Sequence, residues 1–123
     1  MSNGLALRDR LATACVRAVN RLSRLTGRGS GTVAGGRVGL RLAPGLLGSL
    51  ARSRTIILVS GTNGKTTTTS MAVAGWGGVV TTNATGANMP AGHVAALAAG
   101  SSERGVLEVD EAWLPTVMNA TKP

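Results

Sequence analysis

The stretch that most constrains the fold is an apolar run followed at once by a glycine turn and a lysine. Residues Ile56 to Val59 are four consecutive branched apolar side chains, which suit a strand covered on both faces. Residues 60–67 (SGTNGKTT) then carry two glycines, whose backbones reach angles that other residues avoid. Threonines open a predicted helix from Thr66 to about Ala74. The order of strand, glycine turn and helix predicts an α/β fold of the P-loop type.

This turn predicts a site for a polyphosphate, because backbone N–H groups and the helix dipole there favour an anion. Lys65 is placed to reach the β- and γ-phosphates of a nucleotide, and the Thr66 hydroxyl to bind Mg²⁺, with Thr67 as the alternative. The general pattern has a glycine five positions before Gly64, where this chain has Val59, so the loop is a shortened form. The alternative is that this segment is an ordinary glycine turn in which a lysine occurs by chance. The predicted phosphate contacts are Gly61, Thr62, Asn63, Gly64, Lys65, Thr66 and Thr67.

Basic residues are concentrated in the first part of the chain. The net charge is +8, and ten of the 13 lysines and arginines lie within the first 54 positions. No acidic residue occurs between Asp9 and Glu103. This excess of basic residues suggests that the chain binds a polyanion or an anionic membrane surface. High arginine usage without a binding role explains the excess equally well. Nucleic acid is not expected as a partner, because no aromatic residues are interleaved with the arginines.

Residues 5–25 have the period of an amphipathic helix, with arginines between the apolar positions. The apolar positions at spacings of three and four are Leu11, Cys15, Ala18, Leu22 and Leu25. We expect this stripe to pack on the domain; the alternative is a helix that lies on a membrane surface. The glycine-rich segment 27–43 is expected to be a loop with at most a short strand, and Pro44 to open a short helix to about Ala51.

The chain has one cysteine, Cys15, and one histidine, His93, so we expect neither a disulfide nor a transition-metal site. This composition fits a reducing cytoplasm. No run approaches 18 apolar residues, so no membrane span is expected, and arginines at 8, 10 and 17 argue against a secretory signal. We expect a cytoplasmic location, with the inner face of the membrane as one possible place.

Strands and helices alternate after residue 55, which predicts a parallel sheet with flanking helices, preceded by an N-terminal helix. Further strands are predicted at 79–82 and 105–109, and helices at 90–99 and from 112 to about 118. Each strand is followed by a polar loop, and ligands of such sheets bind at the carboxyl ends of the strands. We therefore expect the loops 61–67, 83–90 and 108–111 to form one site.

Glu108 is the carboxylate of most interest, because it lies within an apolar run at a strand end. A carboxylate there is costly unless it has a partner such as Mg²⁺ or Lys65, so we predict Glu108 as a metal ligand. Asp110 and Glu111 fit a solvated acidic loop at least as well, and His93 fits an ordinary helix residue.

The polar loop after the second predicted strand offers Asn83 and Asn88 as further contacts to the phosphates. Taken alone, the two asparagines are also explained by a turn that they stabilise.

Three motifs in the chain resemble the central ATP-binding domain of the Mur ligase superfamily. They are residues 61–67 (GTNGKTT), 82–92 (TNATGANMPAG) and 107–112 (LEVDEA). The first is shared across the superfamily, and the other two are similar to the MurT family, the ligase-like subunits of lipid II isoglutaminyl synthase. The basic segment from Arg21 to Pro44 is also similar, so the resemblance covers nearly the whole chain.

The resemblance implies an ATP-dependent amidation in peptidoglycan synthesis. The α-carboxyl of D-glutamate in lipid II would be activated as an acyl phosphate and amidated to D-isoglutamine with ammonia from a GatD-like glutaminase subunit. Lys65 and the loop amides would hold the phosphates of ATP, with Lys65 and Glu108 as the catalytic residues. Thr66 would bind Mg²⁺, and Glu108 would hold a second Mg²⁺ near the γ-phosphate. The Asn83–Asn88 loop would close over the phosphate and substrate side.

The resemblance also implies a division into a basic helical and loop leader, 1–54, and an incomplete central ATP-binding domain, 55–123. The family's next strand, cysteine zinc ribbon and C-terminal domain have no counterpart in these 123 residues. We therefore expect a truncated form that alone binds nucleotide weakly and catalyses nothing. A non-catalytic P-loop nucleotide-binding fragment, or another ligase of the superfamily such as a folylpolyglutamate synthase, stays open as an alternative.

Overall fold

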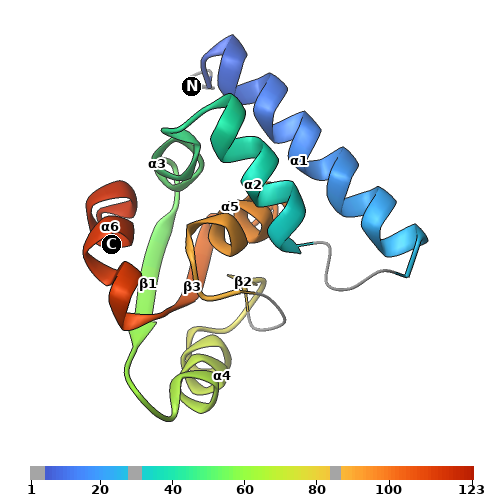
Figure 1. Cartoon of the computed structure of the whole chain (residues 1–123). Coiled ribbons are helices and arrows are strands. Elements are labelled where there is room, and N and C mark those ends of the chain that lie inside the picture. Colours follow the sequence, from blue (N-terminus) through green and yellow to red (C-terminus); the bar gives the residue numbers. More distant parts are fainter. Residues whose placement is uncertain (1–4, 28–31, 84–86) are drawn as a thin grey trace.

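A parallel three-stranded sheet forms the centre of the computed structural model, which describes residues 5–27, 32–83 and 87–123 (Figure 1). The strands are β1 (Thr55–Ser60), β2 (Thr81–Thr82) and β3 (Arg104–Val109), in the order β1-β3-β2. The helices are α1 (Leu7–Leu25), α2 (Thr32–Leu42), α3 (Leu46–Ala51), α4 (Lys65–Trp76), α5 (Pro90–Ala99), η1 (Glu111–Trp113) and α6 (Leu114–Thr121). The predicted fold class is confirmed: an α/β fold with a parallel sheet, flanking helices and an N-terminal helix.

The strand order places the two helices that follow β1 and β2 on opposite faces of the sheet. The chain leaves β1 for the far edge of the sheet at β2 and then returns to the centre at β3. Parallel crossovers are right-handed, so an outward and a returning connection lie on opposite faces. Accordingly, Leu107 belongs to the hydrophobic core with α5, whereas Glu108, its neighbour in β3, contacts α4 on the other face.

One hydrophobic core joins the N-terminal helices to the sheet. Ala12 and Val16 of α1 are fully buried in it, together with Val94 of α5 and Leu107 of β3. Its other members come from the loop before α3 and from α3, α5, α6, β1 and β3: Ala43, Leu46, Leu47, Leu50, Ala51, Ile56, Ala95, Leu97, Ala98, Val109 and Val117. The predicted boundary at residue 54 stays a prediction, and residues on both sides of it contribute to this core.

The expectation of a loop over 27–43 is wrong for the part that the structure describes, because Thr32–Leu42 forms α2. Residues 28–31 of that segment lie outside the described residues. Glycine disfavours helix in isolation, but here the glycines let α2 approach its neighbours closely. An added Cβ at Gly36 would lie 1.7 Å from the Ala91 carbonyl oxygen, and one at Gly39 would lie 2.4 Å from Cγ2 of Val16. Packing against α1 and α5 therefore outweighs the low helix propensity.

The expectation that the leucine stripe of the first helix packs on the domain is also wrong. The residues of α1 that the domain buries are Ala12, Thr13, Val16 and Asn20. Leu11, Leu22 and Leu25 are exposed, because they lie on the opposite side of the helix. Within the described residues, no helix combines the length and apolar character that a membrane crossing requires.

Most other predicted elements are confirmed with shifted ends. The helix predicted at 90–99 has those bounds, and the short helix predicted after Pro44 runs from Leu46 to Ala51. The strand predicted at 79–82 is shorter than expected, because only Thr81 and Thr82 pair with β3 and Val79 is exposed. The helix after the glycine turn continues through Trp76, where Gly77 ends it with φ 70°.

Two arginines from the N-terminal half of the chain form hydrogen bonds to the carboxyl end of α5. Arg17 donates from Nε to the Ala98 carbonyl at 2.6 Å, and Arg54 donates to the carbonyls of Leu97 and Gly100, both at 2.8 Å. The last carbonyls of a helix lack partners within the helix and carry partial negative charge. Part of the basic surplus is therefore structural, since two arginines satisfy the carboxyl end of α5.

The close contact between α2 and α5 predicts a large difference between two glycine-to-alanine substitutions. Gly36→Ala is expected to lower the free energy of unfolding by about 3 kcal/mol, because its Cβ would meet the backbone of Ala91. Gly75→Ala in α4 has open space around its Cβ and is expected to raise it by about 0.5–1 kcal/mol. Urea unfolding of both variants checks this, and equal effects would contradict the described α2–α5 contact.

Candidate nucleotide site

The turn between β1 and α4 has the backbone conformation that the glycine pattern predicted. Gly61 has φ 150° and Gly64 has φ 80°, and both angles favour glycine. Gly64 precedes the first helical residue, Lys65, and its carbonyl accepts the Thr68 N–H at 2.9 Å. The amino end of α4 therefore opens at the carboxyl end of β1, where free backbone N–H groups favour a bound anion.

Lys65 lies back over this turn. Its Nζ donates to the carbonyl oxygen of Gly61 at 2.5 Å, so the ammonium group is held at the loop. The predicted alternative of Lys65 as the partner of Glu108 has no support, since the side-chain partner of Glu108 is Thr66.

Thr66 and Glu108 are the two predicted metal ligands, and the structure brings them together. The Thr66 hydroxyl donates to Oε2 of Glu108 at 3.3 Å, which joins the first turn of α4 to the end of β3. The Glu108 side chain is only 3% exposed, and its Oε1 is buried without a hydrogen-bond partner in the described residues. A buried carboxylate oxygen without a partner is costly, and a cation at this position would compensate it.

This donor set fits Mg²⁺ better than a transition metal. The described residues contain no group of three or more histidine, cysteine or acidic side chains that could hold a metal ion. Mg²⁺ is ordinarily bound by one or two protein oxygens together with phosphate oxygens and waters. One carboxylate and one hydroxyl, from Glu108 and Thr66, supply oxygens of that kind.

Asn83 fixes the backbone of Glu108. Its Nδ2 donates to the Glu108 carbonyl at 2.9 Å, and its Oδ1 accepts the Glu108 N–H at 2.8 Å. Because β2 ends at Thr82, the Asn83 side chain continues the β2–β3 hydrogen bonding where the backbone leaves the sheet. The nucleotide contact predicted for Asn83 stays a prediction, and in the structure this side chain is engaged with Glu108.

The loop after β2 is tied to the loop after β3. The backbone N–H of Asp110 donates to the Asn88 carbonyl at 2.9 Å, and Asn83 also donates to the Ala87 carbonyl at 3.2 Å. Residues 84–86 of the predicted Asn83–Asn88 loop lie outside the described residues. The contact predicted between Asn88 and the phosphate side stays a prediction.

Glu111 reaches the loop between β1 and α4, a contact that the sequence did not predict. Oε1 of Glu111 accepts the hydroxyl of Thr62 at 2.9 Å in an exposed position. The expected parallel sheet could have indicated this contact, because loops that follow adjacent parallel strands meet at the same edge of the sheet. Hydrogen bonds thus join all three loops at the carboxyl edge, as the predicted convergence requires.

His93 is the second contact that sequence reasoning missed. It is fully buried on α5, and its Nε2 lies 2.7 Å from the Glu108 carbonyl oxygen, which also accepts from Asn83. A carbonyl only accepts, so Nε2 carries the proton. Burial lowers the pKa of His93 from its usual value near 6.5, against the opposing effects of the Glu108 hydrogen bond and the Asp110 carboxylate. The sequence feature that could have indicated this contact is that His93 is the one polar side chain in the apolar run 90–99.

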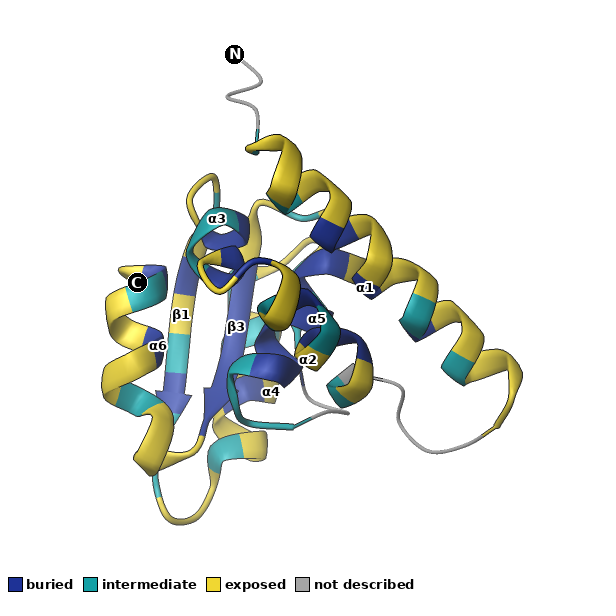
Figure 2. Ribbon diagram, turned by 45° about the horizontal axis from the view of Figure 1, so that its top comes forward, coloured by how far each residue is buried: buried dark blue, intermediate teal, exposed yellow. Residues whose placement is uncertain are grey.

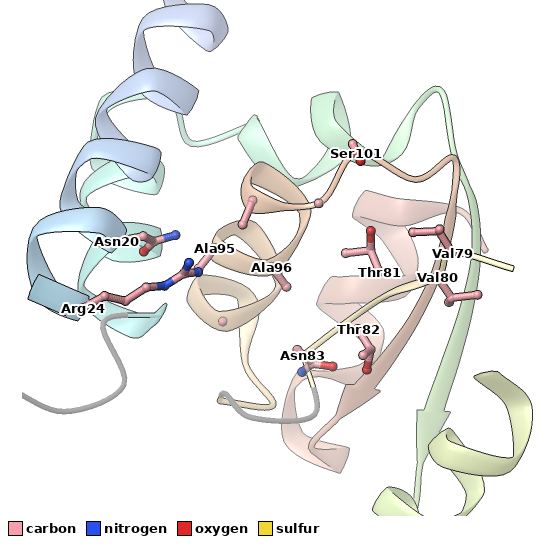
Figure 3. A pocket seen from close by; sticks show the side chains of 13 residues that line it. Asn20, Arg24, Val79, Val80, Thr81, Thr82, Asn83, Ala95, Ala96 and Ser101 are labelled. Carbon is pink, nitrogen blue, oxygen red and sulfur yellow. The ribbon is translucent and has the colours of Figure 1, made fainter. Parts of the chain in front are cut away.

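A cavity of about 390 Å³ lies beside this site rather than in it (Figure 3). It opens between α1, α5 and β2, with Asn20 and Arg24 on one side and Thr81 and Thr82 on the other. Asn83 borders it, but no residue of the loop 61–67 does.

A comparison with curated proteins supports the resemblance drawn from the three motifs. The chain is 42% identical over 110 residues to the lipid II isoglutaminyl synthase (glutamine-hydrolyzing) subunit MurT of Streptococcus pneumoniae (strain ATCC BAA-255 / R6). The match takes in 83% of this chain and 24% of that protein, so the chain spans about a quarter of the relative's length. No family profile and no solved structure matches the chain. The predicted similarity to MurT is confirmed over the matched region.

The burial of His93 predicts a pH dependence of stability. Because the folded pKa lies below the ordinary value, the unfolded chain binds the proton more readily. The free energy of unfolding is therefore expected to fall as the pH drops below about 6.5, and to level off below the folded pKa. Urea unfolding at several pH values checks this. His93→Gln, which keeps a donor near the Nε2 position, should remove this part of the dependence; an unchanged profile in that variant would contradict the assignment.

Proposed function

We propose that this chain forms the phosphate- and Mg²⁺-binding part of an ATP-dependent carbon–nitrogen ligase of the MurT type, which acts in peptidoglycan synthesis. The observation that carries the proposal is the approach of Thr66 Oγ1 to Oε2 of Glu108 at 3.3 Å, directly behind the glycine-lysine loop. The 42% identity to MurT supports the same assignment. A loop, a hydroxyl and a buried carboxylate in this order suit phosphoryl transfer.

The roles of the residues follow from their positions. The backbone N–H groups of Gly61–Thr67 and the Lys65 ammonium would hold the phosphates, with the α4 dipole favouring their charge. Thr66 and Glu108 would hold Mg²⁺, which neutralises phosphate charge when bound. Asn83 and His93 keep the backbone of Glu108 in place through its carbonyl oxygen.

The proposed reaction is the amidation of the D-glutamate α-carboxyl group of lipid II. A carboxylate oxygen attacks the γ-phosphorus of ATP, ADP leaves, and an acyl phosphate results. Ammonia then attacks the acyl carbon, phosphate leaves with the electron pair of the C–O bond, and the nitrogen loses a proton to give D-isoglutamine. A GatD-like glutaminase partner would supply the ammonia, in keeping with the glutamine hydrolysis in the relative's name. The location would be cytoplasmic, where ATP is available.

The proposal predicts that Mg·ATP binding depends on Lys65 and not on the other lysine, Lys122. Lys65→Ala is expected to weaken binding about 10- to 100-fold, which is the usual loss for a hydrogen bond to a charged group. Lys122→Ala removes the same charge from the far end of α6 and is expected to leave the affinity unchanged. Calorimetric titration of the three chains measures this directly.

Two results of that titration would contradict the proposal. The first is a folded wild-type chain that binds no Mg·ATP at millimolar nucleotide concentration. The second is an equal loss of affinity in the Lys65→Ala and Lys122→Ala chains, which would show that only general charge matters. Circular dichroism of each chain establishes that it is folded before the titration is interpreted.

A further inference from the structure

The outward side of α1 carries a continuous apolar stripe on which nothing packs among the described residues. We call this set the outer stripe; it consists of Leu7, Leu11, Ala14, Cys15, Ala18, Leu22 and Leu25. Its four leucines are 73%, 59%, 62% and 77% exposed in that order. Spacings of three and four align them along one side of the helix over its 19 residues. Figure 2 shows this side of α1 as exposed.

The outer stripe is not the side of α1 that packs into the hydrophobic core. The opposite side of α1 already supplies the core, with Ala12 and Val16 both fully buried. The helix therefore has two apolar sides, one covered by the domain and one facing outward. Single exposed leucines are ordinary on a protein surface, but a contiguous apolar stripe of this length marks an interaction site.

Arginines flank the outer stripe and show what kind of surface it fits. On a helical projection, Arg10, Arg17, Arg21 and Arg24 lie along one side of the stripe and Arg8 along the other. Among the described residues, the guanidinium groups of Arg10 and Arg21 have no hydrogen bond or ion pair. Arg8 and Arg17 reach the carbonyls of Leu42 and Ala98, and Arg24 lines the cavity between α1 and α5.

The acidic residue of α1 does not offset this charge. Asp9 is turned toward the domain, where its Oδ2 accepts the Ser49 hydroxyl at 2.7 Å. The outward side of α1 therefore combines leucines with uncompensated positive charge.

We propose that α1 docks by its outer stripe onto the surface of an anionic lipid bilayer. The leucines would enter the boundary between headgroups and acyl chains, and the arginines would lie at the lipid phosphates. A second copy of the chain is a poorer occupant, because pairing two stripes brings arginines against arginines without an acidic side chain between them.

The position of α1 leaves the nucleotide site free. Figure 1 shows α1 on the outside of α2, at the opposite side of the molecule from α4. Lipid binding therefore requires neither nucleotide nor Mg²⁺. If the proposed function holds, the same contact keeps the domain at the surface that carries a lipid-linked substrate.

The single cysteine allows a direct test on the full chain. Cys15 is exposed in the middle of the outer stripe, so a fluorophore sensitive to its surroundings can be attached there. Vesicles of phosphatidylcholine mixed with phosphatidylglycerol are expected to shift its emission to the blue, and vesicles of phosphatidylcholine alone are not. High salt should reverse the shift. Cys15→Ser combined with Ser70→Cys moves the label to the exposed side of α4, where no shift is expected.

Variants separate the apolar from the charged contribution in vesicle co-sedimentation. Leu11→Gln with Leu22→Gln is expected to lower the partition coefficient at least about tenfold. Arg10→Gln with Arg21→Gln is expected to lower it roughly fivefold for each arginine. Two control variants change similarly exposed residues elsewhere on the surface: Met71→Gln with Val79→Gln, and Arg52→Gln with Lys122→Gln. Both controls should bind vesicles as the wild type does.

Three results would overturn the proposal. The first is the absence of any emission shift with anionic vesicles. The second is equal vesicle binding by the stripe variants and their controls. The third is a wild-type chain that does not bind vesicles but self-associates in sedimentation velocity, with Leu11→Gln and Leu22→Gln together abolishing the self-association. The last result would identify the outer stripe as a protein interface. Titration of the same samples with Mg·ATP shows separately whether the proposed function fails.

Discussion

The side chain of Asn83 holds the backbone of Glu108 just beyond the point where the pairing of β2 with β3 ends. β2 pairs with β3 over only Thr81 and Thr82, and Asn83 then adds one donor and one acceptor, at 2.9 and 2.8 Å. His93 contributes a second donor to the same carbonyl at 2.7 Å. A carboxylate that is 3% exposed is therefore fixed in front of Thr66 before any ligand arrives. Ligands held in this way need little reorganisation when a cation binds.

The support of this position extends to the N-terminal helices. His93 belongs to α5, and α5 is held by close packing against α2, where Gly36 approaches Ala91, and by Arg17 and Arg54 at its carboxyl end. A chain with two tryptophans and no other aromatic residue has few large side chains to bury. It compensates by bringing helix backbones close together through glycine and alanine, which also explains why added volume at these contacts is costly.

The loop around Lys65 could be predicted because strand, glycine and lysine follow one another within a few residues, and local backbone chemistry decides its shape. The parallel sheet followed from the alternation of strands and helices. The helix α2 could not be predicted, because its glycines disfavour helix until α1 and α5 are in place. Leu11 and Leu22 were assigned to the core by their spacing, since spacing identifies an apolar side of a helix but not which of two apolar sides the domain covers. The contact of His93 with Glu108 depends on the strand order, which the sequence pattern does not contain.

We propose that the loop 61–67, Thr66 and Glu108 form one site for a nucleotide and its metal ion. Its most direct test is the anomalous scattering of Mn²⁺ in crystals grown with Mn²⁺ and a non-hydrolysable ATP analogue. We expect a peak about 2.2 Å from Thr66 Oγ1 and from a carboxylate oxygen of Glu108, with the phosphates against residues 61–67. A peak at Asp110 or Glu111 with Glu108 unliganded, or an ordered nucleotide away from the loop, would contradict it.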